Sequence, residues 1–65
     1  MKIIVNGAER AIAADTLADA LDQLDYRDAI VATAVNGRFV PAPSRRMTPI
    51  ADGDEIEIVA PMQGG

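Results

Sequence analysis

The chain contains no cysteine and no histidine among its 65 residues. Without cysteine it can form neither disulfides nor thiolate nucleophiles, and without histidine it has no imidazole to act as a general base. Zinc sites of the usual kind are excluded as well, because they are built from these two residue types. Most of the familiar catalytic groups are therefore missing.

Positive charge is also scarce, with six Lys and Arg residues against ten Asp and Glu residues. The formal net charge of −4 argues against a nucleic-acid partner, because affinity for phosphates comes from clustered basic side chains. Long hydrophobic runs are absent as well. No stretch approaches the roughly 20 apolar residues of a membrane span, and the first residues do not resemble a secretion signal. We therefore expect no membrane partner and a cytoplasmic location.

The remaining composition is that of an ordinary globular protein, with 49% hydrophobic and 25% charged residues. Chains that stay disordered are more polar and more highly charged. A domain this small buries only about 60% of the surface that its unfolded chain exposes. The length therefore leaves room for one domain.

Two Asn-Gly pairs predict two β-hairpins. A two-residue type I′ turn needs positive φ at both positions, which Asn tolerates and Gly adopts freely. The second hairpin should end at Pro41 and Pro43, because proline cannot donate a hydrogen bond to a strand ladder. The predicted strands are residues 2–5 and 8–12 around Asn6-Gly7, and residues 31–35 and 38–40 around Asn36-Gly37.

Residues 15–24, between the hairpins, predict an amphipathic helix. Thr16 or Asp15 can cap its amino end by accepting a hydrogen bond from a free backbone N–H. The apolar positions that share one helical face are Leu17, Ala20, Leu21 and Leu24.

Residues 54–59 predict a last strand, which follows a turn at Asp52-Gly53. Ile56 and Ile58 alternate with Glu55 and Glu57, which is typical of a strand with one buried face. The resulting order of elements, β-β-α-β-β-β, predicts the α+β class and a β-grasp fold, in which one main helix packs on one face of a mixed sheet. The first and last strands should lie side by side and parallel. We expect a β-grasp domain over residues 1–60 and a flexible C-terminal Gly-Gly tail over residues 61–65.

The most informative feature is the carboxyl group that follows Gly64-Gly65. Residues without a Cβ atom can enter a narrow pocket, and five extended residues would reach roughly 17 Å from the sheet. The Gly65 carboxylate could then react in the active site of a partner that activates it, with Gly64, Gln63 and Met62 threaded behind it. A frayed chain end is the alternative, because terminal residues are often poorly ordered.

Four segments together resemble the ThiS sulfur carriers of the ThiS/MoaD group, which are ubiquitin-like β-grasp proteins. The match spans the whole chain, and the short length favours the ThiS branch over the longer small subunits of molybdopterin synthase. The segments are Val35-Asn36-Gly37, Val40-Pro41, the run from Asp52 to Val59, and Gly64-Gly65.

This resemblance implies a thiamine-pathway carrier whose Gly65 carboxylate is adenylated by an E1-like partner enzyme that uses ATP and Mg²⁺. Sulfur delivered through a cysteine desulfurase would then convert the adenylate into a thiocarboxylate, which donates sulfur to thiazole synthase. The carrier would not itself be an enzyme, would bind no cofactor and would be monomeric when free. The alternatives are a small subunit of molybdopterin synthase, or a ubiquitin-like protein modifier whose Gly-Gly end forms isopeptides.

Four further side chains are candidates for partner docking. Phe39 and Met47 are large apolar residues outside the core pattern, and either peripheral core packing or docking would suit them. Glu55 and Glu57 face outward on the strand that leads to the tail, where they could steer it toward a basic enzyme mouth or simply confer solubility.

Two groups of charged residues suggest ligands less strongly. Arg45 and Arg46 could grip a phosphate, but we expect them to be solvated surface in this acidic chain. Acids recur every three or four residues through the helix, at a spacing that turns around a 3.6-residue helix and gathers them nowhere. We therefore predict no metal site for Asp15, Asp19, Asp22, Asp25 and Asp28, nor for the turn at 52–55.

Overall fold

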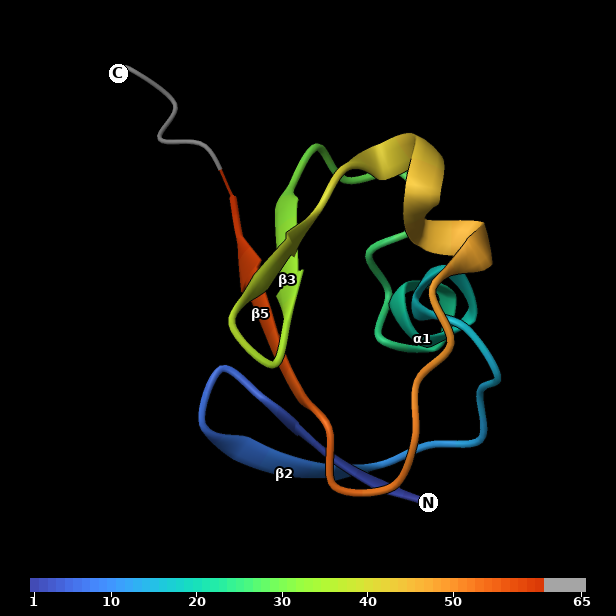
Figure 1. Ribbon diagram of the computed structural model, residues 1–65, viewed down its shortest axis with the longest axis vertical. Coiled ribbons are helices and arrows are strands. Elements are labelled where there is room, and N and C mark those ends of the chain that lie inside the picture. Colours follow the sequence, from blue (N-terminus) through green and yellow to red (C-terminus); the bar gives the residue numbers. More distant parts are fainter. Residues whose placement is uncertain (61–65) are drawn as a thin grey trace.

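Five short strands form one mixed sheet in the computed structural model, which describes residues 1–60 (Figure 1). The strands lie in the order β2-β1-β5-β3-β4. Neighbours pair antiparallel except β1 and β5, which run parallel, so the predicted β-grasp topology is confirmed. The predicted tail at 61–65 lies outside the described residues. The strands are β1 (Lys2–Val5), β2 (Ala8–Ala11), β3 (Ala32–Val35), β4 (Arg38–Val40) and β5 (Glu55–Val59).

Both hairpin turns have the backbone geometry that the Asn-Gly pairs predict. The φ angles are 50° at Asn6, 87° at Gly7, 51° at Asn36 and 82° at Gly37. Three strands are one residue shorter than predicted: β2 at its C-terminal end, and β3 and β5 at their N-terminal ends. β5 begins after Asp54 because this residue belongs to the preceding turn, where its N–H donates to the Ala51 carbonyl at 3.1 Å.

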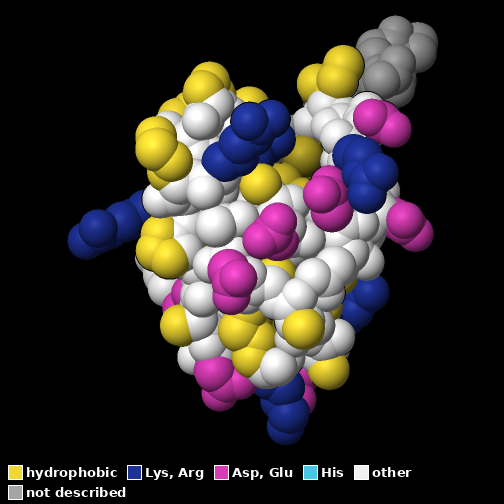
Figure 2. Space-filling view, turned by 90° about the vertical axis from the view of Figure 1, so that its right-hand side faces the viewer, with side chains coloured by type: hydrophobic (Ala, Val, Ile, Leu, Met, Phe, Trp, Pro, Cys, Tyr) yellow, Lys and Arg dark blue, Asp and Glu magenta, His cyan; other side chains and the backbone are white. Residues whose placement is uncertain are grey.

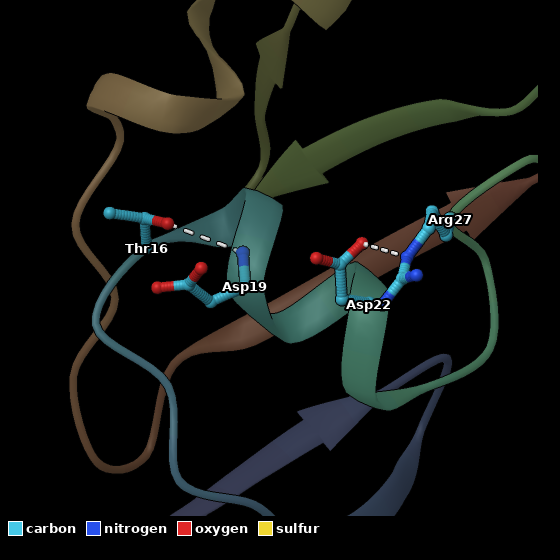
Figure 3. Close-up of polar contacts among 4 residues, drawn as sticks. All are labelled: Thr16, Asp19, Asp22 and Arg27. Atoms are coloured by element: carbon cyan, nitrogen blue, oxygen red, sulfur yellow. Dashed lines mark hydrogen bonds and ion pairs between the residues drawn. The ribbon is translucent and has the colours of Figure 1, made fainter.

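The predicted helix is present but shorter, as α1 (Leu17–Gln23). Thr16 is its N-cap, and its Oγ1 accepts a hydrogen bond from the Asp19 N–H at 3.2 Å (Figure 3). Asp15, the other predicted cap, lies one residue too early for this role. The helix ends at Gln23 with Leu24 as its C-cap, and Asp25 follows with a φ of 68°.

The core lies between α1 and the sheet face that α1 covers (Figure 1). All four apolar positions predicted on the helix are buried, and Ile56 and Ile58 bury the predicted face of β5. Ile50 also belongs to this core, although its segment carries no periodic pattern. Within residues 1–60, no helix has the length and apolar character that crossing a bilayer requires.

A second helical segment, the 3-10 helix η1 (Ala42–Met47), was not predicted. It follows Pro41, and a proline in its first turn fits there because that position has no helical partner for an N–H. η1 packs beside α1 (Figure 1). The prolines therefore end β4 as expected and also begin a new turn of helix.

Arg45 ties η1 to the sheet, so the expectation that it is solvated surface was wrong. Its Nε donates to Thr33 Oγ1 at 3.1 Å, and its Nη2 donates to the Val31 carbonyl at 2.6 Å. The side chain is half-buried, whereas Arg46 beside it is exposed as predicted. Arg45 thus supplies hydrogen-bond donors to Val31 and Thr33 at the N-terminal end of β3. The sequence pattern does not indicate these contacts.

Candidate functional site

β5 is the strand that leads to residues 61–65, and it lies between β1 and β3 at the centre of the sheet (Figure 1). The asparagine of each hairpin turn binds it through the side chain. Asn6 Oδ1 accepts from the Ile58 N–H at 2.8 Å, and Asn6 Nδ2 donates to the Ile58 carbonyl at 3.0 Å. Asn36 Oδ1 accepts from the Glu55 N–H at 3.0 Å, and its Nδ2 donates to Asp54 Oδ1 at 3.1 Å. These two residues, the asparagine clamps, therefore hold β5 near both of its ends.

The clamp at Asn6 can be tested by replacing it with glycine, which keeps the positive φ and removes only the side chain. The Ile58 N–H and carbonyl then lose their partners, and we expect the free energy of unfolding to fall by about 1–3 kcal/mol. Urea denaturation measures this change. Asn6→Ala should cost more, because it adds backbone strain in the left-handed region. Wild-type stability in Asn6→Gly would show that the side-chain bonds contribute nothing.

The sheet face turned away from α1 carries an exposed apolar surface beside the end of β5. Ala34 on β3 is in register with Phe39 on β4 and with Glu57 on β5, so these three form a row across the face. Phe39 is 69% exposed and Val59 is 62% exposed. With Ala32, Thr33 and Ala34 they line a hollow of about 140 Å³. This surface, the open-face hollow, could seat an apolar side chain of a partner.

The structure brings three of the four predicted docking residues onto this face. Phe39 and Glu57 line the hollow, and Glu55 shares their side of the sheet because β5 alternates between exposed and buried residues. Met47 is separate, because it lies on η1 beside α1, where it is 81% exposed. Core packing, the alternative considered for Phe39 and Met47, is excluded for both.

Val59 was missed as a candidate, although the pattern of β5 contains the signal. It has the same strand parity as Glu55 and Glu57, so it must share their exposed face. Ala32 and Ala34 were missed because short side chains carry no hydrophobic signal of their own. The asparagine clamps were interpreted only as turn formers, since a sequence does not show that a turn side chain reaches a third strand.

The predicted reacting residue, Gly65, lies outside the described residues, as do Gly64, Gln63 and Met62. Their assignments stay predictions. The acidic residues of the helical segment are all exposed, and Figure 2 shows acidic side chains spread over the face that carries α1 and η1. Among residues 1–60 no three or more possible ligands come together as a metal site would require.

Comparison with known proteins adds an independent line of evidence. The sequence profile of the ThiS family matches residues 3–65. A thiazole synthase from Paramagnetospirillum magneticum is 38% identical over 66 residues, which cover 100% of this chain and 20% of that protein. This chain therefore spans about a fifth of that relative's length.

Two solved structures from Geobacter metallireducens share the fold. The crystal structure of thiamine biosynthesis protein ThiS has a TM-score of 0.82 and 28% identity, with 100% of both chains covered. A solution NMR structure of a thiamine biosynthesis protein has a TM-score of 0.78 and 26% identity, covering 100% of this chain and 88% of the other. Since the profile, the topology and the sheet order agree over nearly the whole sequence, the chain belongs to the ThiS family.

Proposed function

We propose that this chain is the sulfur carrier for thiazole formation in thiamine biosynthesis, and that the sulfur is bound at the carboxyl group of Gly65. The observation that carries the proposal is the ThiS family match, which runs through Gly65 itself. The composition agrees with a carrier that is not an enzyme. A chain with neither Cys nor His cannot hold sulfur as a persulfide, and it offers no imidazole base for catalysis.

The proposed chemistry has three steps on Gly65. A partner adenylating enzyme joins the carboxylate to the α-phosphate of ATP, with Mg²⁺, and releases pyrophosphate. Persulfide sulfur delivered through a cysteine desulfurase then attacks the acyl carbon, so that a C–S bond forms, the bond to the phosphate oxygen breaks and AMP leaves. A thiol then attacks the sulfur of the donor in the acyl disulfide, so that the S–S bond breaks, a new disulfide forms on the donor and the Gly65 thiocarboxylate is released. Activation is needed because a free carboxylate resists nucleophilic attack, whereas the mixed anhydride has a good leaving group.

The described domain would present this tail in a fixed direction. The asparagine clamps hold β5 near both ends, so the point where residue 60 leaves the sheet is set by the fold. Gly64 and Gly65, which lack Cβ atoms, suit entry into a narrow active site. The carrier would work as a monomer in the cytoplasm and bind no cofactor of its own.

Thiazole synthase is the proposed acceptor of the sulfur. A relative that bears this name contains a stretch like this chain within a much longer protein. Two domains in one polypeptide meet at high effective concentration, which suits domains that act on each other. The two solved structures are of thiamine biosynthesis proteins, and this favours the proposal over a molybdopterin-synthase subunit or a protein modifier.

ATP–pyrophosphate exchange catalysed by the adenylating enzyme tests the first step. The chain should stimulate exchange at saturating ATP, because formation of the acyl adenylate is reversible. A variant of the chain with its C-terminal carboxyl group converted to an amide should not stimulate exchange, because it has no carboxylate to adenylate, although its folded domain is unchanged. Equal exchange with the amidated chain would contradict the proposed role of Gly65.

The open-face hollow is the surface proposed to dock the partner enzymes. Phe39 and Val59 supply exposed apolar area beside the tail, and Glu55 and Glu57 give the same face negative charge. A partner with an apolar side chain for the hollow and basic residues around its active-site mouth would be complementary to it.

Charge reversal on this face should slow association with the adenylating enzyme. We expect Glu55→Lys with Glu57→Lys to lower the association rate constant by about tenfold at low salt and to change dissociation less. Stopped-flow mixing at low and high salt measures both rate constants. Asp19→Lys with Asp28→Lys is the control, because it changes net charge equally elsewhere. An equal loss in both variants would mean that only net charge matters.

A further inference from the structure

The helical side of the molecule carries a second surface, separate from the open-face hollow. A groove of about 340 Å³ lies between α1, the loop that follows it, and η1. Its walls include Tyr26, Arg27, Arg45 and Arg46, and Ala18 and Ala42 contribute small apolar side chains. Leu21 and Asp22 complete its lining, and we refer to this surface as the basic groove.

The basic groove has the opposite charge from the rest of the protein. Three of the six basic residues of the chain line it, and Asp22 is the one acidic residue in its lining. The lining of the groove therefore carries a formal charge of +2 in a chain whose net charge is −4, and Arg27 also lines a neighbouring hollow with Asp22, Asp25 and Asp28.

The arginines of the groove are partly preorganised and still have free donors. Arg45 is held by its bonds to Thr33 and Val31, which use two of its five N–H donors. Arg27 is oriented by Asp22, whose Oδ1 lies 3.3 Å from the Arg27 Nε (Figure 3). Arg46 makes no ion pair within the part of the chain that the structure describes. Guanidinium groups arranged in this way can bind carboxylates in a bidentate manner.

We propose that the basic groove docks an acidic segment of a partner protein, with at least two carboxylates bound by Arg27, Arg45 and Arg46. Charge complementarity supports this occupant. Isolated ion pairs at an exposed site are weak, so a single small anion would gain little here. A protein segment could also cover Tyr26 and the exposed Met47, which follows Arg46 on η1. The inference does not depend on sulfur chemistry at Gly65.

A capped hexaglutamate peptide is the probe, and ¹⁵N NMR of the whole chain is the measurement. We expect chemical-shift changes to gather at residues of the basic groove and to be absent with a hexaglutamine peptide. Arg27→Gln with Arg46→Gln should weaken binding by about tenfold, because two charge pairs are lost. Arg10→Gln with Arg38→Gln removes the same charge outside the groove and should change affinity less than about twofold.

Asp22→Asn should increase the affinity for the peptide. The variant would not bind more tightly if the arginines of the groove only stabilised the fold. It removes the acidic residue of the groove and frees the Arg27 guanidinium, so peptide affinity should rise about threefold. Asp19→Asn, on the same helix but outside the groove lining, should leave affinity unchanged.

Several results would overturn the proposal. The first is equal weakening by the two arginine pairs, and the second is an absence of shifts with hexaglutamate. Inorganic phosphate that produces the same shifts without any peptide binding would reassign the groove to a small anion. Self-association in sedimentation experiments, lost in Arg27→Gln with Arg46→Gln, would instead assign it to a second copy of this chain.

Discussion

Removing Gly64 and Gly65 is expected to abolish ATP-dependent activation of the chain and to leave its folding intact. The reacting carboxylate would then follow Gln63, two residues short of the adenylating site and attached to a residue with a Cβ atom. The core among the described residues runs only from Ile3 to Ile58. The free energy of unfolding should therefore change by no more than about 0.5 kcal/mol. Exchange assays and thermal unfolding measure the two effects separately.

Two tail variants are the controls for this deletion. Gln63→Ala keeps both glycines and the carboxylate in place, so it should retain activation within a fewfold of the wild type. A chain with one alanine added after Gly65 should be inactive, because it places a Cβ atom and a displaced carboxylate in the pocket. Full activity of the deletion variant, or a large loss of its stability, would contradict the carrier mechanism.

The largest expected loss of stability is that of Ile56→Ala. Ile56 is 1% exposed on the central strand β5, where it packs in the core beneath α1. Truncation of a buried isoleucine costs about 2–5 kcal/mol, because transfer free energy is lost and a cavity is left. A domain of this size has a total stability of only about 3–5 kcal/mol from its core. Much of the Ile56→Ala population should therefore be unfolded at room temperature.

Val59→Ala is the matched control on the same strand. Val59 is 62% exposed on the opposite face, so its truncation should change the free energy of unfolding by no more than about 0.5 kcal/mol. Far-UV circular dichroism with urea titration compares the two variants. If both lose equal stability, β5 does not have the two distinct faces described above.

The sheet and its helix could be predicted because each local signal agrees with the final fold. Asn-Gly pairs require turns with positive φ, the leucine spacing fits one helical face, and isoleucine alternates with glutamate along β5. These signals act over two to seven residues. The parallel pairing of β1 and β5 was part of the β-grasp arrangement that the element order predicts, in which the long segment between them supplies the crossover that parallel strands need.

The features that could not be predicted depend on contacts between distant residues. η1 has a sequence that indicates only the end of β4, and it is held in place by Arg45 reaching back to β3. Asn6 binds Ile58 across 52 positions, which no local pattern encodes. The basic groove likewise joins residues from α1, the following loop and η1. Charge counts along the sequence could not show that three arginines meet there.

The sequence alone suggests chemistry for the candidate site, which stays a prediction, but it shows little of the surrounding surface. Terminal glycines have a chemical consequence that does not need a fold, so Gly65 was a candidate from sequence alone. The docking surface depends on which side chains share a sheet face. Alternation placed Glu55 and Glu57 correctly, whereas Met47 could be assigned to the other side of the molecule only after η1 was seen.

The most direct test is the intact mass of the chain after incubation with the adenylating enzyme, ATP and a sulfur source. The proposed mechanism predicts a rise equal to the exchange of one oxygen atom for one sulfur atom, and fragmentation should place the change on Gly65. The increase should disappear when ATP is omitted. An unchanged mass with active partner enzymes, or sulfur located on any residue other than Gly65, would contradict the assignment of this chain as a thiocarboxylate carrier.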